Sequence, residues 1–195
     1  MIILIRHGQT TTNAQRLLVG RSDPHLTELG ERQALALVPY LGGVCEVWVS
    51  PLARARETAA LALPDFEARV VESFVEVDYG EFDGQPLSVI SLEGWRAFDH
   101  DAAFGGGESL ASVDQRVHAE LDALLSDESS LLHDHDRHLA IVSHVSPIKS
   151  AAVWALGVTG STTWRTRLDN GSITTIGIRG ATPQLVRFNA VPALN

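Results

Sequence analysis

The sequence predicts an α/β protein: a three-layer α/β/α sandwich with a mostly parallel sheet of about six strands and a C-terminal hairpin. Short β-branched runs alternate with segments of helical periodicity along the 195 residues. The first run, 2–5, is continuously apolar, as in a strand that is buried on both faces. Hydrophobic residues make up 45% of the chain, so we expect residues 1–195 to bury one core and form a single domain.

The opening strand is followed by a predicted helix and a second strand. Thr27 is expected to cap the helix, and the glycine pair at 42–43 to end it. An i, i+3, i+4, i+7 spacing predicts its apolar face, which consists of Ala34, Leu37, Val38 and Leu41. The next apolar run, 44–49, is the predicted second strand.

A Ser-Pro pair is predicted to start the second helix. Ser50 is the expected N-cap and Pro51 the first helical residue, and the helix should reach about Leu63. Residues 69–72 are a weak candidate for a third strand. Residues 79–108 are irregular and contain several glycines, which is typical of connections that form active-site walls or lids.

The second half of the chain should add a helix, a strand, another helix and a hairpin. Ser109 is expected to begin a helix whose apolar face is Leu110, Val113, Val117, Leu121 and Leu124. Residues 139–142 are a predicted buried strand, and the Ser-Pro pair at 146–147 is a second expected helix start. Residues 172–178 and 184–188 are predicted to pair as a hairpin.

Composition excludes two classes of partner. A net charge of −9 leaves no basic excess to neutralise nucleic-acid phosphates, although a local cationic pocket could still hold a small anion. No stretch is long enough for a transmembrane helix, and no basic segment precedes the apolar run at 2–5 as in a signal peptide. We therefore expect a cytoplasmic protein with no membrane partner.

The cysteine and histidine patterns indicate neither a disulfide nor a metal site. Cys45 is the single cysteine, and its place before the apolar run 47–49 predicts a buried, inert thiol. The histidine- and aspartate-rich segment 133–138 has loose spacing and no ordered scaffold, so we interpret it as a solvated loop.

Chemically active side chains follow each predicted strand of the parallel sheet. Ligands of such sheets bind beyond the carboxyl ends of the strands, where these side chains should meet. The residues in question are Arg6, His7, Gly8, Ser50, Arg54, Glu76, Ser143 and His144.

Two arginines and two histidines at one edge suit a phosphate group. Guanidinium groups bind phosphate oxygens bidentately and keep their charge, and helix N-termini add N–H donors. Gly8 would let the backbone approach the ligand closely. A neutral histidine nitrogen can attack phosphorus. Glu76 is the candidate to protonate the leaving oxygen and then activate water, provided that partial burial lets it hold a proton.

The motifs that carry this constellation resemble those of the histidine phosphatase superfamily, the phosphoglycerate mutase-like fold. The resemblance covers nearly the whole chain, and the order and spacing of the motifs make it specific. The family patterns R-H-G-x-T-x-x-N, L-T-x-x-G-x-x-Q-A, S-x-L-x-R-A-x-x-T-A, E-x-x-x-G-x-x-x-G, G-E-S and the second-histidine block match residues 6–13, 26–34, 50–59, 76–84, 107–109 and 143–149.

This resemblance implies a role for each matched residue and no metal or other cofactor. It implies that His7 is the phosphorylated nucleophile and that Glu76 is the proton donor and acceptor. The same resemblance implies that the phosphoryl group is bound by Arg6, Gly8, Asn13, Arg54, His144 and the N–H of Val145.

Register with the family also decides between neighbouring candidates. It selects Arg54 over Arg56, which is then expected to be solvated or ion-paired. It selects Glu76 over the nearby acids Glu72, Asp78 and Glu81, by the distance to the following glycine. Val145 departs from the family, whose members usually have glycine directly after the second histidine.

The sequence favours a metal-independent phosphatase of small phosphorylated metabolites. The cofactor-dependent mutases of the family carry a longer, basic segment after the glutamate block, whereas residues 85–108 here contain only Arg96 besides a histidine. A mutase, or a non-catalytic phosphate-binding module of the same fold, is the alternative. Ribazole phosphates, sugar phosphates, phosphoglycerates and protein phosphohistidine all remain possible substrates. Trp95 is the tryptophan best placed to touch substrate, and Arg165 or Arg167 could reach an anionic group unless paired with Asp169.

Overall fold

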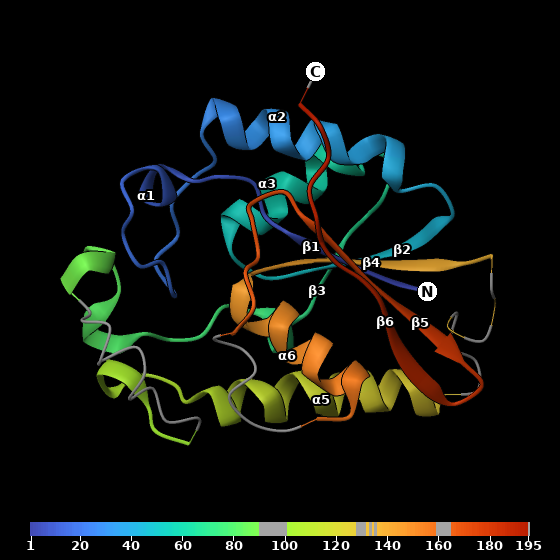
Figure 1. Ribbon diagram of the computed structural model, residues 1–195. Helices are drawn as coiled ribbons and strands as arrows, with labels where there is room; N and C mark the ends of the chain where they lie inside the picture. Colours follow the sequence, from blue (N-terminus) through green and yellow to red (C-terminus); the bar gives the residue numbers. More distant parts are fainter. Residues whose placement is uncertain (90–100, 128–131, 133, 135, 159–164, 195) are drawn as a thin grey trace.

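A six-stranded sheet between two layers of helices forms the centre of the molecule, as the sequence predicts (Figure 1). The computed structural model describes residues 1–89, 101–127, 132, 134, 136–158 and 165–194. The strands are β1 (Ile2–Arg6), β2 (Val44–Val49), β3 (Arg69–Val70), β4 (His138–Ser143), β5 (Ile173–Arg179) and β6 (Thr182–Ala190).

The strand order is β3-β2-β4-β1-β5-β6. β1 to β4 are parallel, β5 is antiparallel to β1, and β6 completes the predicted C-terminal hairpin. Val142 of β4 lies opposite both Ile5 of β1 and Val49 of β2, so these three strands end at the same level. The residues that follow them therefore emerge together at the carboxyl edge of the sheet.

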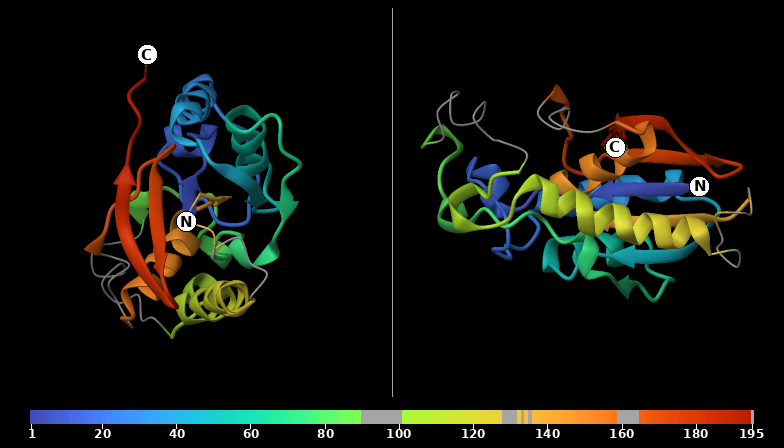
Figure 2. Two further views of the ribbon diagram at one scale, coloured as in Figure 1. Left: turned by 90° about the vertical axis from the view of Figure 1, so that its right-hand side faces the viewer. Right: turned by 90° about the horizontal axis from the view of Figure 1, so that it is seen from below.

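The helices cover both faces of the sheet, α2 and α3 on one and α5 and α6 on the other (Figure 2). The α-helices are α1 (Thr11–Ala14), α2 (Glu28–Leu37), α3 (Ala53–Ala62), α5 (Leu110–Ser126) and α6 (Val145–Leu156). Short 3-10 turns are η1 (Val38–Tyr40), η2 (Glu72–Phe74), η3 (Gly80–Phe82), η4 (Leu87–Val89) and η5 (Phe104–Gly106). No helix in the described part of the chain is long and apolar enough to span a membrane.

β1 contributes to both cores, because its successive side chains point to opposite faces of the sheet. Ile2 and Leu4 pack in the cluster that includes the apolar face of α5, whereas Ile3 and Ile5 pack in the cluster under α2 and α3. All four side chains are buried. This explains why the opening run is continuously apolar instead of alternating.

Three predicted helix boundaries are wrong by a few residues. α2 ends at Leu37 and continues only as a 3-10 turn, since Pro39 lacks the N–H that an α-helix needs there. α3 begins at Ala53 instead of Pro51, and α6 begins at Val145 instead of the Ser-Pro pair. The predicted third strand is likewise reduced to the two residues of β3.

The predicted burial of Cys45 is also wrong. Cys45 is exposed, and its Sγ accepts a hydrogen bond of 3.3 Å from Arg137 Nε. It lies in the first half of β2, where the side chains are less buried than at the carboxyl half. Trp95 and part of segment 133–138 lie outside the described residues.

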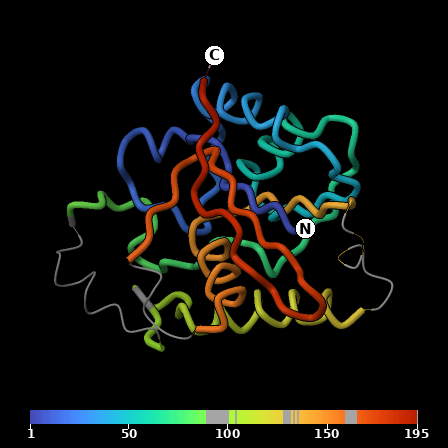
Figure 3. The backbone as a smooth tube through the Cα atoms, turned by 45° about the vertical axis from the view of Figure 1, so that its right-hand side comes forward, coloured from blue at the N-terminus to red at the C-terminus, as the bar shows by residue number. Residues whose placement is uncertain are grey.

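Connections far apart in the sequence gather on the side of the sheet away from the N-terminus (Figure 3). They include the segment after β1, the segment around η3 and the segment before β5. The glycine-rich segments around η3 and η5 pack closely, because a Cβ on Gly80 would lie 1.9 Å from the carbonyl oxygen of Gly105. This side of the molecule is where the predicted active residues should meet.

Candidate active site

His7, Arg54 and His144 form a buried cluster at the carboxyl edge of the sheet. Arg54 Nε lies 3.3 Å from His7 Nε2 and 3.2 Å from His144 Nδ1. The two imidazole rings are tilted by 57° with their centroids 5.1 Å apart. Arg54 and His144 are fully buried and His7 is 3% exposed. The structure therefore brings together three residues that lie up to 137 positions apart, as the end positions of β1, β2 and β4 predict.

Arg54 is held in place by its own helix and by a turn that packs over it. It lies in the first turn of α3, and Thr58, one turn later, donates to its carbonyl oxygen at 2.7 Å. Its Nη1 donates to the carbonyl of Ser22 at 2.7 Å, and its Nη2 donates to the carbonyl of Gly20 at 2.8 Å. These bonds point Nε toward the two histidines.

The proton of His7 can be assigned from its hydrogen bonds. Nδ1 lies 2.7 Å from the carbonyl oxygen of Gly8, which can only accept, so Nδ1 carries the proton. Nε2 then has an unprotonated lone pair, which accepts from Arg54 Nε. This is the nitrogen that can act as a nucleophile.

The tautomer of His144 follows in the same way. Because Arg54 Nε–H faces Nδ1, that nitrogen is an acceptor and Nε2 bears the proton. Nε2 donates to Ser50 Oγ at 2.6 Å, and Ser50 is fully buried. Ser50 therefore fixes the His144 ring and is not the N-cap that the sequence predicts for α3. Its place directly after β2 is the signal that could have identified it.

Burial is the largest cause that holds the pKa values of both histidines well below their usual value of 6.5. The charges of Arg54 and Arg6 lower both pKa values further. Both rings are therefore neutral at neutral pH. Burial also lowers the pKa of Arg6 to about 10, which leaves that guanidinium charged.

Glu76 lies at the N-terminus of α6 and is 3% exposed. Its Oε1 accepts from the N–H groups of Val77 and Ser146 at 2.9 and 3.1 Å, and its Oε2 accepts from the N–H of Val145 at 3.1 Å. A carboxylate at a helix N-terminus satisfies orphan N–H groups and interacts favourably with the helix dipole. These contacts explain why α6 starts at Val145, and they show that the N–H of Val145 has Glu76 as its acceptor in the structure.

Arg6 and Lys149 are anchored by carbonyls of the segment before β5. Arg6 Nη1 donates to the carbonyl of Leu168 at 2.6 Å, and Lys149 Nζ donates to that of Thr166 at 2.7 Å. Arg6 Nε is buried with no hydrogen-bond partner in the described part of the chain. Burial lowers the pKa of Lys149 to about 8, although Glu76 opposes that shift. The sequence analysis did not identify Lys149, which lies one helical turn after Val145.

Gly8 has a packing role that the sequence analysis did not predict, and its predicted approach to a ligand stays a prediction. A Cβ at this position would lie 2.3 Å from the carbonyl oxygen of Gly30, so the glycine is required by the packing of β1 against α2. Its N–H donates to Thr58 Oγ1 at 3.0 Å. The backbone that it approaches closely is therefore that of the protein itself.

Asn13 is joined to the backbone of His7 through Asn170, which the sequence analysis missed. Asn170 Nδ2 donates to Asn13 Oδ1 and to the carbonyl of His7, both at 3.2 Å. Asn13 also takes part in a capping box with Thr10 at the start of α1. Its amide group is thus held next to the backbone of His7.

The remaining basic candidates lie on the surface. Arg56 is exposed, as predicted. Arg167 is exposed and pairs with Asp169 at 2.6 Å, which is the alternative that the sequence left open. Among the described residues, no group of three or more His, Cys, Asp and Glu side chains could hold a metal ion.

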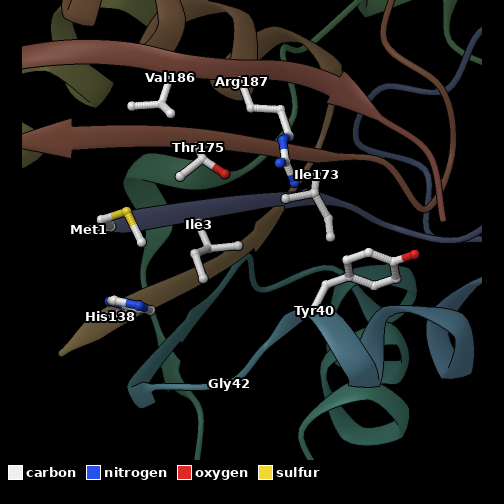
Figure 4. Close-up of a pocket in the computed structure, with 9 residues that line it drawn as sticks. All are labelled: Met1, Ile3, Tyr40, Gly42, His138, Ile173, Thr175, Val186 and Arg187. Atoms are coloured by element: carbon white, nitrogen blue, oxygen red, sulfur yellow. The ribbon is translucent and has the colours of Figure 1, made fainter. Parts of the chain in front are cut away.

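A separate pocket of about 280 Å³ opens at the amino ends of β1 and β4 (Figure 4). His138, the first residue of β4, and Arg187 of β6 line it together with Tyr40. None of the lining residues belongs to the cluster around His7. The pocket is therefore separate from the candidate active site.

Comparison with known proteins places these residues in a family. Residues 2–191 match the histidine phosphatase superfamily (branch 1). The bifunctional protein Rv2228c of Mycobacterium tuberculosis is 34% identical over 182 residues, which cover 88% of this chain and 48% of that protein. The chain thus spans about half the length of the first curated relatives that it matches.

Two further proteins are similar over most of both chains. The probable phosphoglycerate mutase GpmB of Erwinia tasmaniensis is 34% identical over 185 residues, 90% of this chain and 83% of that one. Among solved structures, the mycobacterial glucosyl-3-phosphoglycerate phosphatase Rv2419c, in complex with VO3, has a TM-score of 0.87. It is 26% identical, and the match covers 97% of this chain and 98% of the other.

Proposed function

Because the chain belongs to branch 1 of the histidine phosphatase superfamily, we propose that it hydrolyses small phosphomonoesters through a phosphohistidine on His7. The observation that carries this proposal is the pairing of an unprotonated His7 Nε2 with Arg54 Nε at 3.3 Å. The nitrogen supplies an electron pair, and the guanidinium next to it supplies fixed positive charge for a phosphoryl group. The buried, unpartnered Nε of Arg6 is a further donor that an anionic oxygen would satisfy.

The first step transfers the phosphoryl group to the protein. His7 Nε2 attacks phosphorus, the bond from phosphorus to the ester oxygen breaks, and the leaving oxygen takes a proton from the carboxyl group of Glu76. Arg6 and Arg54 stabilise the charge on the other phosphoryl oxygens. His144 adds to this only when its Nδ1 takes up a proton, because in the neutral ring that nitrogen is an acceptor. The products of this step are a free alcohol, phosphorylated His7 and a Glu76 carboxylate.

The second step releases phosphate. The Glu76 carboxylate takes a proton from water, the water oxygen attacks phosphorus, and the bond to His7 Nε2 breaks. In the structure Glu76 accepts three N–H bonds, which fix the position of its two carboxylate oxygens. The proton that Glu76 takes from water in this step is the one that it gives to the leaving oxygen of the next substrate.

The structure also suggests how Val145 takes part. Its N–H donates to Glu76 Oε2 at 3.1 Å in the resting site. When Glu76 gives or receives a proton, this N–H can change its hydrogen-bond acceptor from the carboxyl group to a phosphate oxygen. Gly8 and Asn13 then contribute by fixing the His7 backbone. If Asn13 also binds the phosphoryl group, the donor is its amide nitrogen, because its amide oxygen already accepts from Asn170.

A hydrolase is favoured over a mutase by the sequence of the segment after Glu76. Residues 85–108 carry Arg96 as their single arginine or lysine, which gives little positive charge to retain a doubly anionic sugar acid. The relative named as a probable phosphoglycerate mutase keeps the mutase as a second candidate. The two activities differ in whether water or a substrate hydroxyl receives the phosphoryl group from His7.

The direct experiment is hydrolysis of p-nitrophenyl phosphate with EDTA present, from acidic to neutral pH. We expect phosphate release that is lost in His7→Ala and retained in the control His118→Ala, a partly exposed histidine on α5. A panel of phosphorylated metabolites that includes 3-phosphoglycerate, with and without its bisphosphate, then separates hydrolysis from isomerisation. Absence of hydrolysis in the wild-type protein, or equal activity in His7→Ala, would contradict the proposal.

A further inference from the structure

We propose that Asp83 is a positioning residue for Arg54, acting through the turn that contains Gly20 and Ser22. The proposal rests on the proposed role of Arg54 in binding phosphate. Asp83 lies in the segment after Glu76, 29 positions from Arg54 in the sequence, and it does not belong to the constellation that the strand ends predict. Its side chain nevertheless binds the same turn as the Arg54 guanidinium, from the other side.

Asp83 binds the turn with both of its carboxylate oxygens. Oδ1 accepts from the N–H of Gly20 at 3.0 Å and from the hydroxyl of Ser22 at 2.8 Å. Oδ2 accepts from the N–H of Ser22 at 2.7 Å. Partial burial alone would raise the pKa of Asp83, but these hydrogen bonds outweigh it and lower the pKa. The carboxylate is thus ionised at neutral pH and fully engaged with the turn.

The opposite side of the same turn holds Arg54. The carbonyls of Gly20 and Ser22, the two residues whose N–H groups Asp83 binds, accept from Arg54 Nη2 and Nη1. Asp23, the next residue, accepts from the N–H of Ala53 at the start of α3 through its Oδ1 at 2.7 Å. The turn is therefore fixed between Asp83 and the helix that carries Arg54.

This connection sets the direction of the guanidinium. Arg54 has several rotatable bonds, and its two terminal nitrogens reach fixed carbonyls only if the turn keeps its place. With both terminal nitrogens bound, Nε points at His7 Nε2 and His144 Nδ1. Among the described residues, no arginine or lysine forms an ion pair with Asp83, so the hydrogen bonds that join Asp83 to Arg54 run through the turn. The two opposite charges also interact directly, because the charge of Arg54 helps to lower the pKa of Asp83.

The test compares Asp83→Asn with Glu81→Gln, a control that neutralises an exposed carboxylate two positions away. Asparagine has one acceptor oxygen, so its amide nitrogen must face an N–H or O–H donor of the turn. We expect the KM for p-nitrophenyl phosphate and the inhibition constant for inorganic phosphate to rise about tenfold, with a smaller change in kcat. Asp83→Glu, which keeps the carboxylate, should recover part of the loss, and Glu81→Gln should match the wild type.

A second readout tests the geometry without relying on activity. The Nε–H of Arg54 is buried between two imidazoles, so in nitrogen-15 NMR its exchange with water should be slow and its chemical shift distinctive. In Asp83→Asn we expect a shifted and faster-exchanging Nε–H, whereas Glu81→Gln should leave it unchanged. Ser22→Ala, which removes only the 2.8 Å hydroxyl contact, should move the signal in the same direction by less and serves if Asp83→Asn folds poorly.

The outcomes distinguish the positioning role of Asp83 from the binding of phosphate by Arg54. An unchanged Arg54 Nε–H signal in Asp83→Asn overturns the positioning role. A penalty of Asp83→Asn on phosphate binding that persists in full in an Arg54→Ala background also overturns it, because a residue acting through Arg54 adds nothing once Arg54 is gone. A moved signal with unchanged phosphate affinity supports the positioning role and contradicts phosphate binding by Arg54.

Discussion

Replacing Ser50 by alanine removes the hydroxyl that fixes the ring of His144. Ser50 Oγ accepts the 2.6 Å hydrogen bond from His144 Nε2, and both residues are fully buried. The variant leaves a buried N–H without an acceptor, which costs about 1–3 kcal/mol of unfolding free energy. For a chain of 195 residues, each kcal/mol corresponds to about 2–4 °C in Tm.

Activity should fall for a separate reason. Without Ser50, His144 can move its proton to Nδ1, which lies 3.2 Å from the Nε–H donor of Arg54. The two donors then repel, and the ring and the guanidinium move apart. A contact of about 1.4 kcal/mol lost from the transition state corresponds to about a tenfold fall in kcat/KM, and we expect at least that.

The assay measures Tm and kcat/KM of Ser50→Ala beside Ser150→Ala. Ser150 is also a buried serine, but its Oγ has no hydrogen-bond partner among the described residues, so its removal should cost little. A double-mutant cycle with His144→Ala should show that the effect of Ser50→Ala on kcat/KM disappears when His144 is absent. Equal Tm and kcat/KM values for the two serine variants would refute the assignment of Ser50 and the tautomer of His144.

Two further predictions concern pH and Gly8. The folded protein holds the pKa values of His7 and His144 well below 6.5, so below pH 6.5 the unfolded chain binds protons that the folded chain does not. The free energy of unfolding should therefore fall as pH decreases from 6.5, by about 1.4 kcal/mol per pH unit for each histidine. Urea unfolding at a series of pH values should show a weaker dependence of this free energy on pH in the His7→Gln, His144→Gln double variant. An equal slope in the two proteins would contradict the burial of neutral histidines. Gly8→Ala should destabilise the fold by about 1–3 kcal/mol, because its Cβ would meet the Gly30 carbonyl at 2.3 Å, whereas Gly42→Ala, which faces open space, should unfold like the wild type. Loss of phosphate binding with an unchanged Tm in Gly8→Ala would instead favour a ligand-approach role for this glycine.

The parts of the fold that sequence predicts well depend on short-range periodicity and on strand ends. The apolar run of β1 indicates a strand buried on both faces, and its side chains do enter both cores. Parallel strands of similar length end at one edge, so the sequence alone could place His7, Arg54 and His144 together. Their mutual distances then follow from the register of β1, β2 and β4.

The errors arise where a side chain is used by a distant partner. Ser50 looks like an N-cap, but its hydroxyl is taken by His144, 94 positions away. α6 starts early because the Glu76 carboxylate, 70 positions from Ser146, caps its first turn. Cys45 looks buried by its neighbours, yet it lies in the less covered half of β2. The capping by Glu76 and the exposure of Cys45 have no local signal in the sequence, whereas Ser50 has one in its place directly after β2.

The central claim is that the Nε2 atom of His7 carries the phosphoryl group during turnover. The most direct measurement is mass spectrometry of the protein quenched in alkali, which preserves phosphohistidine, during hydrolysis of p-nitrophenyl phosphate. We predict an added phosphate on the peptide that contains His7, absent in His7→Ala and accumulating in Glu76→Gln, in which water is no longer activated. A wild-type protein that turns over substrate without any phosphate on His7 would contradict the mechanism.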